Sequence, residues 1–511
     1  MKVTILWLRT ALRIHDNPVL LEALRSQHNQ VILPLFVLDS PRLHKENSTV
    51  RLRFLYESIS DLNTSFKKYF GTPLNVLDGQ PDNLFEAILA SKDFSVTGII
   101  TGYSNKPYDI EQERLVRAVL EKNKIPLHIV AKVNTLTNIE KVVSDPNFKK
   151  PKSMKDIEKI FAQYYPKNSD GFFSIDEPLP KPSAQLKTSP VISKLISQYI
   201  FDLEQELETI SDTTKSYFKG GETEALLRLA HKVTSEEEYV RKFSKPQTSS
   251  TNLPENPLEP HTTGLSPYLS FGCLSPRALW KACEKCYQNG EHTKPPVSLH
   301  GQMLFREMFH ILSRSVANWD TDTNNSMCKK IRWDEADAEI LSKWEKGETG
   351  FPYIDAMMRQ LNVTGWMHHL GRHAVSCFLT RGQLWQHWKH GRDVFDKKLV
   401  DGDWALNNGN WLWLAGVAPF SMPYFRLYNP CPSAKSSLNA ETKLATFVRH
   451  WVPELKDYPS KYIYEPHLAP ISVQESAGCL IGQDYPMPIV DRKIAARENL
   501  AKFKMSLAEL K

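Results

Sequence analysis

Two histidines one helical turn apart are the residues of this chain whose type and spacing most directly suggest chemistry. His369 and His373 lie in the stretch WMHHLGRHAV (366–375), with Arg372 beside the second of them. Their neighbours are mainly apolar, so the pattern predicts a buried helix that carries both imidazoles on one face. Imidazole titrates near neutral pH and can transfer a proton or bind a metal. Core histidines with an ordinary structural role are the simpler alternative.

A buried arginine beside these histidines requires an acidic partner. The best candidates lie in VDGDWALNNGNWLWLAG (400–416), where Asp401 and Asp403 are followed by Asn407. No carboxylate or cysteine stands at the spacing of the familiar HxxxH zinc enzymes, so we expect no metal here.

A further polar group interrupts an apolar helix pattern at residues 302–316. Gln302 and Arg306 are one turn apart and share a face, among apolar neighbours that argue against a surface stripe. Six of the twelve tryptophans fall between residues 366 and 413, a density typical of a core or of a pocket for a flat ligand. These residues predict a deep polar pocket walled by tryptophan. Such a pocket suits a large, planar, phosphate-bearing cofactor, for which flavin adenine dinucleotide (FAD) is the natural fit.

Hydroxyl groups gather in HTTGLSPYLS (261–270). Thr262, Thr263 and Ser266 surround a glycine immediately before a helix that Pro267 can start. Hydroxyls and exposed N–H groups at a helix start can bind a phosphate. A plain N-cap turn explains the same residues equally well.

The elements that must position these residues change in type along the chain. Residues 1–136 alternate short β-rich runs with amphipathic helical stretches, which predicts a doubly wound parallel sheet. The predicted strands are 3–9, 31–39, 74–79, 96–103 and 127–133, and helices are expected at 51–66 and 110–122. No GxGxxG follows the first strand, so the ordinary dinucleotide fingerprint is absent.

The remaining chain divides into a connector and a helical domain. Proline and lysine collect in residues 137–214, which predicts a long, partly irregular connector. Residues 215–511 predict an all-α domain, with amphipathic segments at 222–242, 302–316, 335–346, 354–362, 366–379 and 488–508.

Composition narrows the class of protein. With 511 residues, 41% hydrophobic and 24% charged, the chain is typical of a soluble globular protein of two or three domains. There is no membrane-spanning run and no signal-peptide pattern, so we expect an intracellular protein. Seven scattered cysteines indicate reduced thiols, and a lone CxxC (283–286) does not predict a zinc site. The net charge of +6 permits binding to DNA without establishing it.

Over essentially its whole length the chain resembles the photolyase/cryptochrome family. LWLRTALRIHDNPVL (6–20) is similar to the family's opening strand and helix. Five later stretches are similar to its flavin-domain signatures and stand in the family's order: TGLSPYLSFGCLSPR, GQMLFRE, GFPYIDAMMRQLNVTGWMHH, RHAVSCFLTRG and DGDWALNNGNWLW. The resemblance implies an N-terminal α/β antenna domain and a C-terminal helical domain that holds FAD in a bent form.

The resemblance also implies roles for particular residues. Thr262, Thr263 and Ser266 would bind the FAD phosphates, with Lys245 nearby. Arg372 would pair with Asp401. The ribityl chain and isoalloxazine would be surrounded by Gln302, Arg306, His369, Arg372, Asp401, Asp403 and Asn407, of which Asn407 would face the flavin N5 atom. A second, antenna chromophore of the deazaflavin or folate type is expected in the N-terminal domain, but the sequence does not identify it.

A tryptophan relay that carries electrons from the surface to the flavin is another implied feature. Trp411, Trp388 and Trp333 match its three members, and Trp385 matches a fourth, outer position found in the animal-type branch. The i,i+3 spacing of Trp385 and Trp388 predicts that they share one helix face. Ordinary core aromatics would give the same pattern.

Within the family, the two histidines match the branch of (6-4) photolyases and animal cryptochromes. The branch that repairs cyclobutane pyrimidine dimers has glutamate where Gln302 stands, and asparagine and methionine where His369 and His373 stand. Breaking a (6-4) photoproduct needs proton transfer as well as an electron, and histidine suits that step. We therefore expect a (6-4) DNA photolyase, a carbon–carbon lyase, with His369 as general acid and His373 as its hydrogen-bonded partner.

The expected substrate is ultraviolet-damaged DNA, single- or double-stranded, whose lesion flips into the pocket of a monomeric protein. Gln302, Trp413 and Arg426 are the candidate substrate-binding residues, and the compartment would be the nucleus in a eukaryote and the cytoplasm otherwise. The rival hypothesis is an animal-type cryptochrome that senses blue light and signals through a partner. A cyclobutane dimer photolyase is a weaker alternative, although PYFRLYNP (423–430) is worded more like that branch. A flavin oxidoreductase using NAD(P)H is the most distant alternative, because no nicotinamide site is visible.

Overall fold

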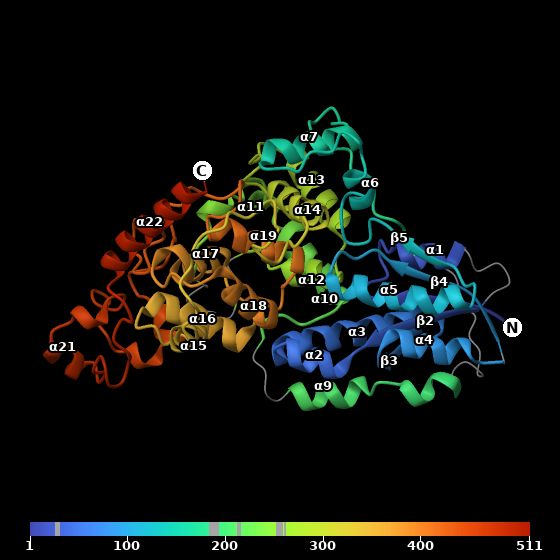
Figure 1. Cartoon of the computed structure of the whole chain (residues 1–511), viewed down its shortest axis with the longest axis horizontal. Helices are drawn as coiled ribbons and strands as arrows, with labels where there is room; N and C mark the ends of the chain where they lie inside the picture. Colours follow the sequence, from blue (N-terminus) through green and yellow to red (C-terminus); the bar gives the residue numbers. More distant parts are fainter. Residues whose placement is uncertain are drawn as a thin grey trace. The chain divides into compact units, whose positions relative to one another are not determined.

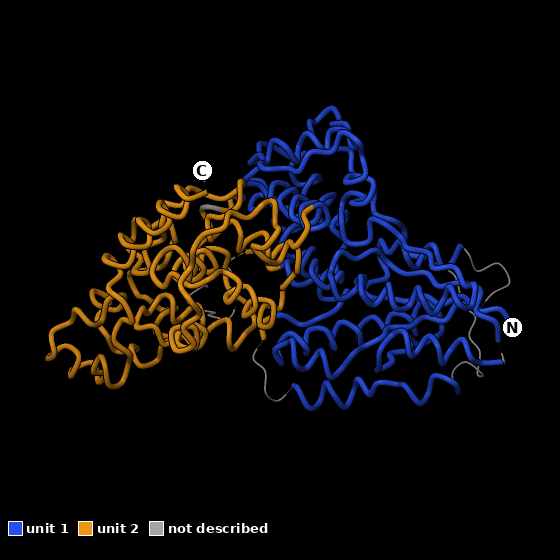
Figure 2. The backbone as a smooth tube through the Cα atoms, in the orientation of Figure 1, with its two compact units in different colours: residues 1–214, 218–243, 265–315 blue, residues 215–217, 244–264, 316–511 orange. Residues whose placement is uncertain are grey.

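A computed structural model describes residues 1–25, 31–92, 94–182, 194–211, 216–251, 259 and 262–510 (Figure 1). The chain forms two compact units (Figure 2). Unit 1 comprises residues 1–214, 218–243 and 265–315, and unit 2 comprises residues 215–217, 244–264 and 316–511.

A five-stranded parallel sheet forms the centre of unit 1. Its strand order is β3-β2-β1-β4-β5, so the order reverses beside β1, as in doubly wound sheets. The strands are β1 (Lys2–Leu8), β2 (Val31–Leu38), β3 (Asn75–Asp78), β4 (Ser95–Gly102) and β5 (Leu127–Val130). Six of the seven β1 residues are buried. A strand of a parallel sheet that is covered on both faces is buried along its length, which explains why its sequence is a nearly continuous apolar run. All five predicted strands and the predicted fold class are confirmed.

Helices cover both faces of this sheet. On one face Trp7 packs edge-on against Phe85 of α4 at 5.1 Å between ring centroids, in a cluster that α5 completes with Val116. On the other face α1 packs against β1, β4 and β5, and the absence of a side chain at Gly102 lets Val19 approach. The helices of this half of unit 1 are α1 (Pro18–Arg25), α2 (Ser40–Glu46), α3 (Thr49–Phe70), α4 (Pro81–Leu89) and α5 (Pro107–Lys122).

The described part of the predicted connector contains helices that pack on the rest of unit 1. Helices α6 (Ile139–Val143) and α7 (Met154–Tyr164) lie against α14 (Leu299–Ser315), and α9 (Leu203–Ser211) lies against α3. The other helices of unit 1 are α10 (Glu222–Leu229), α11 (Glu237–Lys242), α12 (Ser266–Ser270) and α13 (Pro276–Gln288). The compact units therefore differ from the domains predicted from the sequence, 1–136, 137–214 and 215–511. Those boundaries were placed where the type of secondary structure changes, and they stay a prediction.

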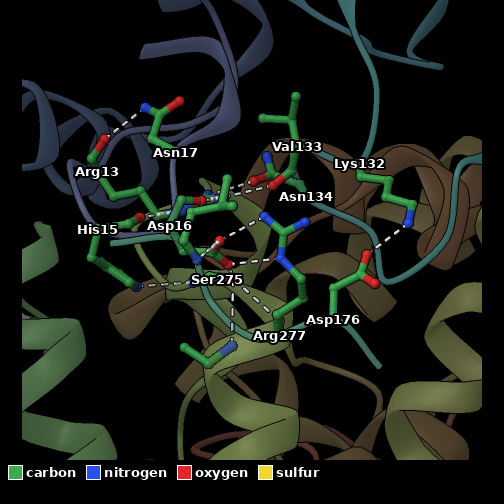
Figure 3. A network of polar contacts seen from close by, with 12 residues as sticks. Arg13, His15, Asp16, Asn17, Lys132, Val133, Asn134, Asp176, Ser275 and Arg277 are labelled. Atoms are coloured by element: carbon green, nitrogen blue, oxygen red, sulfur yellow. Dashed lines mark hydrogen bonds and ion pairs between the residues drawn. The ribbon is translucent and has the colours of Figure 1, made fainter. Parts of the chain in front are cut away.

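A buried polar network ties α13 to the loop after β1 (Figure 3). The Asp16 carboxylate accepts hydrogen bonds from Arg277 Nε at 2.9 Å and Nη2 at 2.6 Å, and from the Ser275 hydroxyl. The guanidinium of Arg13 donates to the backbone oxygens of Val133 at 2.5 Å and Gly272 at 2.8 Å. The polar residues of the opening stretch 6–20 therefore serve the assembly of unit 1.

Unit 2 is helical, as the sequence predicts. Its helices are α15 (Ala338–Lys346), α16 (Pro352–Thr364), α17 (His369–Cys377), α18 (Trp388–Lys398), α19 (Trp404–Leu414), α20 (Thr446–Trp451), α21 (Ile471–Ser476) and α22 (Arg492–Glu509). Helix α16 packs against α15, α17 and α20, and α18 packs along α19. No helix in the described ranges has the length and apolar character needed to cross a membrane.

Candidate functional site

The two histidines lie one turn apart at the start of α17, as their spacing predicted. Gly365 ends α16 in the left-handed conformation (φ 67°), and the ring Nδ1 of His368 then accepts the Leu370 N–H at 3.1 Å and caps α17. The rings of His369 and His373 are 5.6 Å apart between centroids. Helix geometry therefore fixes the two imidazoles as a pair.

The two imidazoles differ in their polar contacts. Within the described part of the chain His369 Nε2 is buried without a hydrogen-bond partner. His373 Nδ1 lies 3.1 Å from the Tyr428 hydroxyl, and the His373 ring packs edge-on against Trp413 at 4.8 Å. One imidazole thus has an unused nitrogen, while the other is held from both sides.

Burial and positive neighbours lower the pKa of both histidines. For His369 burial is the largest cause, followed by the charges of His368 and Lys245. For His373 burial again dominates, followed by Lys245 and His368. Burial and the nearby Arg372 also lower the pKa of Lys245 to about 8. Both imidazoles are consequently neutral at neutral pH in this surrounding.

Arg372 is partly exposed rather than buried, and it has the acidic partner that the sequence called for. Arg372 Nη2 donates to Asp401 Oδ2 at 2.9 Å, and its Nε donates to the Met367 oxygen at 2.8 Å. Asp403 instead caps α19, where its carboxylate accepts the Leu406 N–H at 3.1 Å. Of the two candidate carboxylates, Asp401 is the one that forms the ion pair with Arg372.

Helix α19 also carries Asn407, whose amide lies against α18. Its Nδ2 donates to the Arg392 backbone oxygen at 3.0 Å and to Asp396 Oδ1 at 2.6 Å. The side chain is buried, with 7% of the residue exposed.

The donors of unit 2 fit a phosphate-bearing flavin cofactor. Lys245 is only partly exposed and forms no ion pair with an acidic residue of the described ranges. His369, whose pKa the charge of Lys245 helps to lower, adds a buried Nε2 atom with no partner among the described residues. Thr262 accepts the Gly264 N–H at 3.3 Å, where Gly264 has a positive φ of 62°. A buried cation, an unused imidazole nitrogen and a glycine turn with hydroxyls form a donor set that suits a dinucleotide.

Three of the residues predicted around the flavin belong to unit 1. Gln302 and Arg306 lie one turn apart on α14, where Gln302 Nε2 donates to the Pro296 oxygen at 2.8 Å and Arg306 Nη1 to the Asn134 oxygen at 2.7 Å. Ser266 begins α12 and is exposed. The other predicted cofactor residues, with Thr263 and Lys245 among them, belong to unit 2.

The predicted relay tryptophans lie on neighbouring elements of unit 2. Trp333 and Trp385 are in contact at 4.9 Å between ring centroids. Trp388 begins α18, and Gly391 follows it one turn later on the same helix. The ring of Trp411, on α19, fills the space over Gly391, where an added Cβ atom would stand 2.0 Å from that ring. Only glycine at position 391 lets the Trp411 ring approach α18 so closely.

One prediction about the tryptophans is wrong. Trp385 lies in the turn before α18, with a positive φ of 52°, so it does not share a helix face with Trp388. His387 caps α18, and Trp385 Nε1 donates to the Arg332 backbone oxygen at 2.9 Å. The turn, rather than helical periodicity, brings Trp385 to Trp333.

The hydrogen-bond partners of the histidines carry no local signal in the sequence. Tyr428 stands 55 residues from His373, and no local pattern links them. His368 Nε2 forms a hydrogen bond of 3.1 Å with Thr248 Oγ1, and its Nδ1 caps α17. Two hydrogen bonds therefore fix the His368 ring. The doubled histidine at 368–369 was the only available signal. Arg426, a predicted DNA contact, is exposed in the turn 423–426.

Known protein families match both halves of the chain. A family model described as DNA photolyase matches residues 4–183, and one described as the FAD binding domain of DNA photolyase matches residues 298–505. The (6-4) DNA photolyase of Arabidopsis thaliana is 37% identical and that of rice (Oryza sativa subsp. japonica) 36%, over 97% and 96% of this chain and 87% and 88% of theirs. Mouse (Mus musculus) Cryptochrome-1 is 34% identical over 99% of this chain and 80% of its own.

Solved structures share the fold. The cryptochrome of Synechocystis sp. PCC6803 superposes with a TM-score of 0.79 at 24% identity, covering 98% of this chain and 99% of that one. The archaeal photolyase of Sulfolobus tokodaii, solved with two FAD molecules, gives 0.72 at 23% identity over 99% of this chain and 100% of that one.

Proposed function

Because this chain belongs to the photolyase/cryptochrome family, we propose that it is a (6-4) photolyase, which uses blue light to repair (6-4) photoproducts in DNA. FAD is its cofactor. In its reduced form, FAD supplies the light-excited electron that such a repair requires. The observation that carries the proposal is the pair His369 and His373 on α17, with one unused imidazole nitrogen and one imidazole held by Tyr428.

The arrangement of the pair suits proton transfer to a lesion. His373 is neutral and Tyr428 has a pKa raised to about 12 by burial, so the phenol donates to His373 Nδ1. His373 then carries its own proton on Nε2. His369 Nε2 has no hydrogen-bond partner among the described residues, which leaves this atom for the substrate. We assign His369 as the general acid and His373 as its neighbour on the same helix face. The predicted hydrogen bond between the two rings is absent from the described residues, because His373 Nδ1 faces Tyr428 instead.

The charges around His369 add a condition to this assignment. Burial and the positive charges of Lys245 and Arg372 disfavour its protonated form in the DNA-free protein. A bound DNA strand brings negative phosphates, and these offset the positive neighbours. His369 therefore becomes protonated together with substrate binding, rather than before it.

We assign binding of the damaged DNA to the three residues that the sequence predicted for this role. Trp413, which packs against His373, and the exposed Arg426 belong to unit 2, and Gln302 belongs to unit 1. The damaged dinucleotide would flip out of the strand, at a cost that the damage itself lowers. Contacts to phosphates would make the affinity fall with salt.

Two further assignments accompany the proposal. Trp411, Trp388, Trp333 and Trp385 act as a relay that delivers electrons for reduction of the cofactor, and the contact of Trp333 with Trp385 supports its outer end. A second chromophore of the deazaflavin or folate type belongs to unit 1; the two FAD molecules of the Sulfolobus photolyase add FAD to these candidates.

The second candidate function is a blue-light receptor of the cryptochrome type. It is favoured by the 34% identity to mouse Cryptochrome-1, which is close to the values for the (6-4) photolyases. A receptor would use the same cofactor and relay and would signal through a protein partner. Repair of the lesion distinguishes the two functions.

The deciding experiment gives the photoreduced holoprotein DNA that carries either a defined (6-4) photoproduct or a cyclobutane dimer, under blue light. We expect conversion of the (6-4) lesion alone, and its loss in His369→Ala but not in His128→Ala, which replaces an exposed histidine. Conversion of the cyclobutane dimer would refute the branch assignment. Repair of neither lesion, with normal cofactor photoreduction, would establish the receptor instead.

A further inference from the structure

The amide of Asn407 is held by two groups that decide which of its ends points away from α18. Its Nδ2 lies 2.6 Å from Asp396 Oδ1 and 3.0 Å from the Arg392 backbone oxygen. A carboxylate and a carbonyl accept hydrogen bonds but do not donate them. Both hydrogens of the Asn407 amide are therefore used on the α18 side. Its Oδ1 must point the other way, because an oxygen in the place of Nδ2 would face two acceptors.

Asp396, whose side chain is 36% exposed, has a second contact on its own helix. On α18 it stands one turn after Arg392, whose Nε lies 3.6 Å from Asp396 Oδ2. The same guanidinium donates to Asn408 Oδ1 at 2.8 Å and so ties α18 to α19. One carboxylate oxygen thus faces Arg392 and the other faces Asn407. This arrangement holds the Asn407 amide against rotation.

We propose that Asp396 is a positioning residue that keeps the Asn407 oxygen turned toward the flavin, where it accepts the N–H formed at N5 on reduction. The proposal rests on the position beside N5 that the family resemblance implies for Asn407. Reduction by two electrons and one proton creates that N–H, whereas the oxidised N5 presents a lone pair to the same oxygen. An oxygen fixed in this orientation favours the reduced cofactor and raises its midpoint potential.

The direction in which the midpoint potential changes in Asp396→Ala distinguishes a positioning role of Asp396 from a purely electrostatic one. A carboxylate near the cofactor repels the electrons of the reduced form, so removing its charge alone would raise the potential. Freeing the Asn407 amide has the opposite effect, because the oxygen is no longer held toward N5. Asp396→Ala should therefore lower the potential, by about ten-fold in the equilibrium constant for reduction, as for one lost hydrogen bond. Ten-fold is about 30 mV for a two-electron couple.

Asp393 offers a matched control on the same helix. It pairs with the same Arg392, with 2.7 Å between Oδ1 and Nε, and 63% of its side chain is exposed. Asp393→Ala removes the same charge near the same arginine, and no hydrogen bond links Asp393 to Asn407. We expect the potential of this variant to stay unchanged or to rise slightly.

The test is a spectroelectrochemical titration of the FAD-loaded protein with Asp396→Ala, Asp393→Ala, Asn407→Ala and the Asp396/Asn407 double variant. A fall in Asp396→Ala that disappears in the Asn407→Ala background supports the proposal, since the two residues then act as one unit. A potential in Asp396→Ala that equals or exceeds that of Asp393→Ala overturns it. If Asn407→Ala itself leaves the potential unchanged, the position of Asn407 beside N5 is wrong and the proposal falls with it; repair of the (6-4) lesion is measured separately. Asp396→Ser serves if alanine loosens α18, and thermal unfolding monitors the fold of every variant.

Discussion

At the scale of single residues, the charge of Lys245 acts on both histidines of α17. Its pKa is lowered to about 8 by burial and by Arg372, so it is charged below pH 8 and neutral above it. If it binds the FAD phosphates, the apparent affinity for FAD should fall about ten-fold between pH 7 and pH 9, because the charged fraction falls by that factor. Fluorescence titration of the flavin-free protein measures this affinity.

Removal of the charge at position 245 should abolish that pH dependence. Lys245→Met should weaken FAD binding by roughly ten- to a hundred-fold at pH 7, the range for a lost charge-assisted hydrogen bond. Lys242→Met is the matched control, since Lys242 is exposed and pairs with Glu238. An unchanged affinity in Lys245→Met would remove this residue from the cofactor site.

Tyr428 is the residue that separates orientation of His373 from binding of the substrate. Tyr428→Phe keeps the ring but deletes the hydroxyl 3.1 Å from His373 Nδ1. We expect the single-turnover rate of (6-4) repair to fall about ten-fold, as for one lost orienting hydrogen bond, with DNA affinity unchanged. Tyr424→Phe is the control, because the Tyr424 ring stacks on Phe503 instead. Weaker DNA binding in Tyr428→Phe, with a normal rate on bound DNA, would assign the hydroxyl to the substrate.

At the scale of elements, Arg381 shapes the segment that carries Tyr428. It is fully buried in the short helix η4 (Phe378–Gly382) and donates to the backbone oxygens of Leu414 at 2.8 Å, Tyr424 at 2.6 Å and Arg426 at 2.8 Å. A lysine cannot reproduce this fork, so Arg381→Lys should destabilise the protein by about 2–4 kcal/mol. Urea unfolding measures the loss, and hydrogen exchange should increase at residues 424–428. Arg497→Lys, at an exposed position, should leave both unchanged.

The sequence predicted those elements whose signal is local. The five strands were found within a few residues because each is a short apolar run bounded by polar or turn residues. Helical spacing predicted the two histidines of α17. The need of an arginine for a carboxylate indicated Asp401 or Asp403, and only the family resemblance selected Asp401. Trp385 was misplaced, since nothing local predicts a tryptophan with positive φ. The contacts of Tyr428 with His373 and of Asp396 with Asn407 depend on tertiary packing, which no sequence spacing encodes.

At the scale of the whole molecule, acid should weaken the protein through the network around Asp16. Burial alone would raise the pKa of Asp16, but the hydrogen bonds and charge of Arg277 outweigh it and lower the pKa. The unfolded chain titrates this group near pH 4, which is higher than in the folded protein. The contribution to stability is therefore present above about pH 4 and is lost as the pH falls through the folded pKa.

Substitution at position 16 tests this account. Asp16→Asn leaves the buried Arg277 without its carboxylate and should lower the free energy of unfolding by about 3–5 kcal/mol at pH 7. Asp176→Asn is the control, drawn in Figure 3 as well, because 53% of the Asp176 side chain is exposed and its ion pair with Lys132 contributes at most about 1 kcal/mol. Urea unfolding between pH 7 and pH 3 should show a smaller loss on acidification in Asp16→Asn than in the unsubstituted protein. Parallel losses in the two proteins would mean that Asp16 titrates alike in the folded and unfolded states, and that the ion pair with Arg277 does not hold unit 1 together.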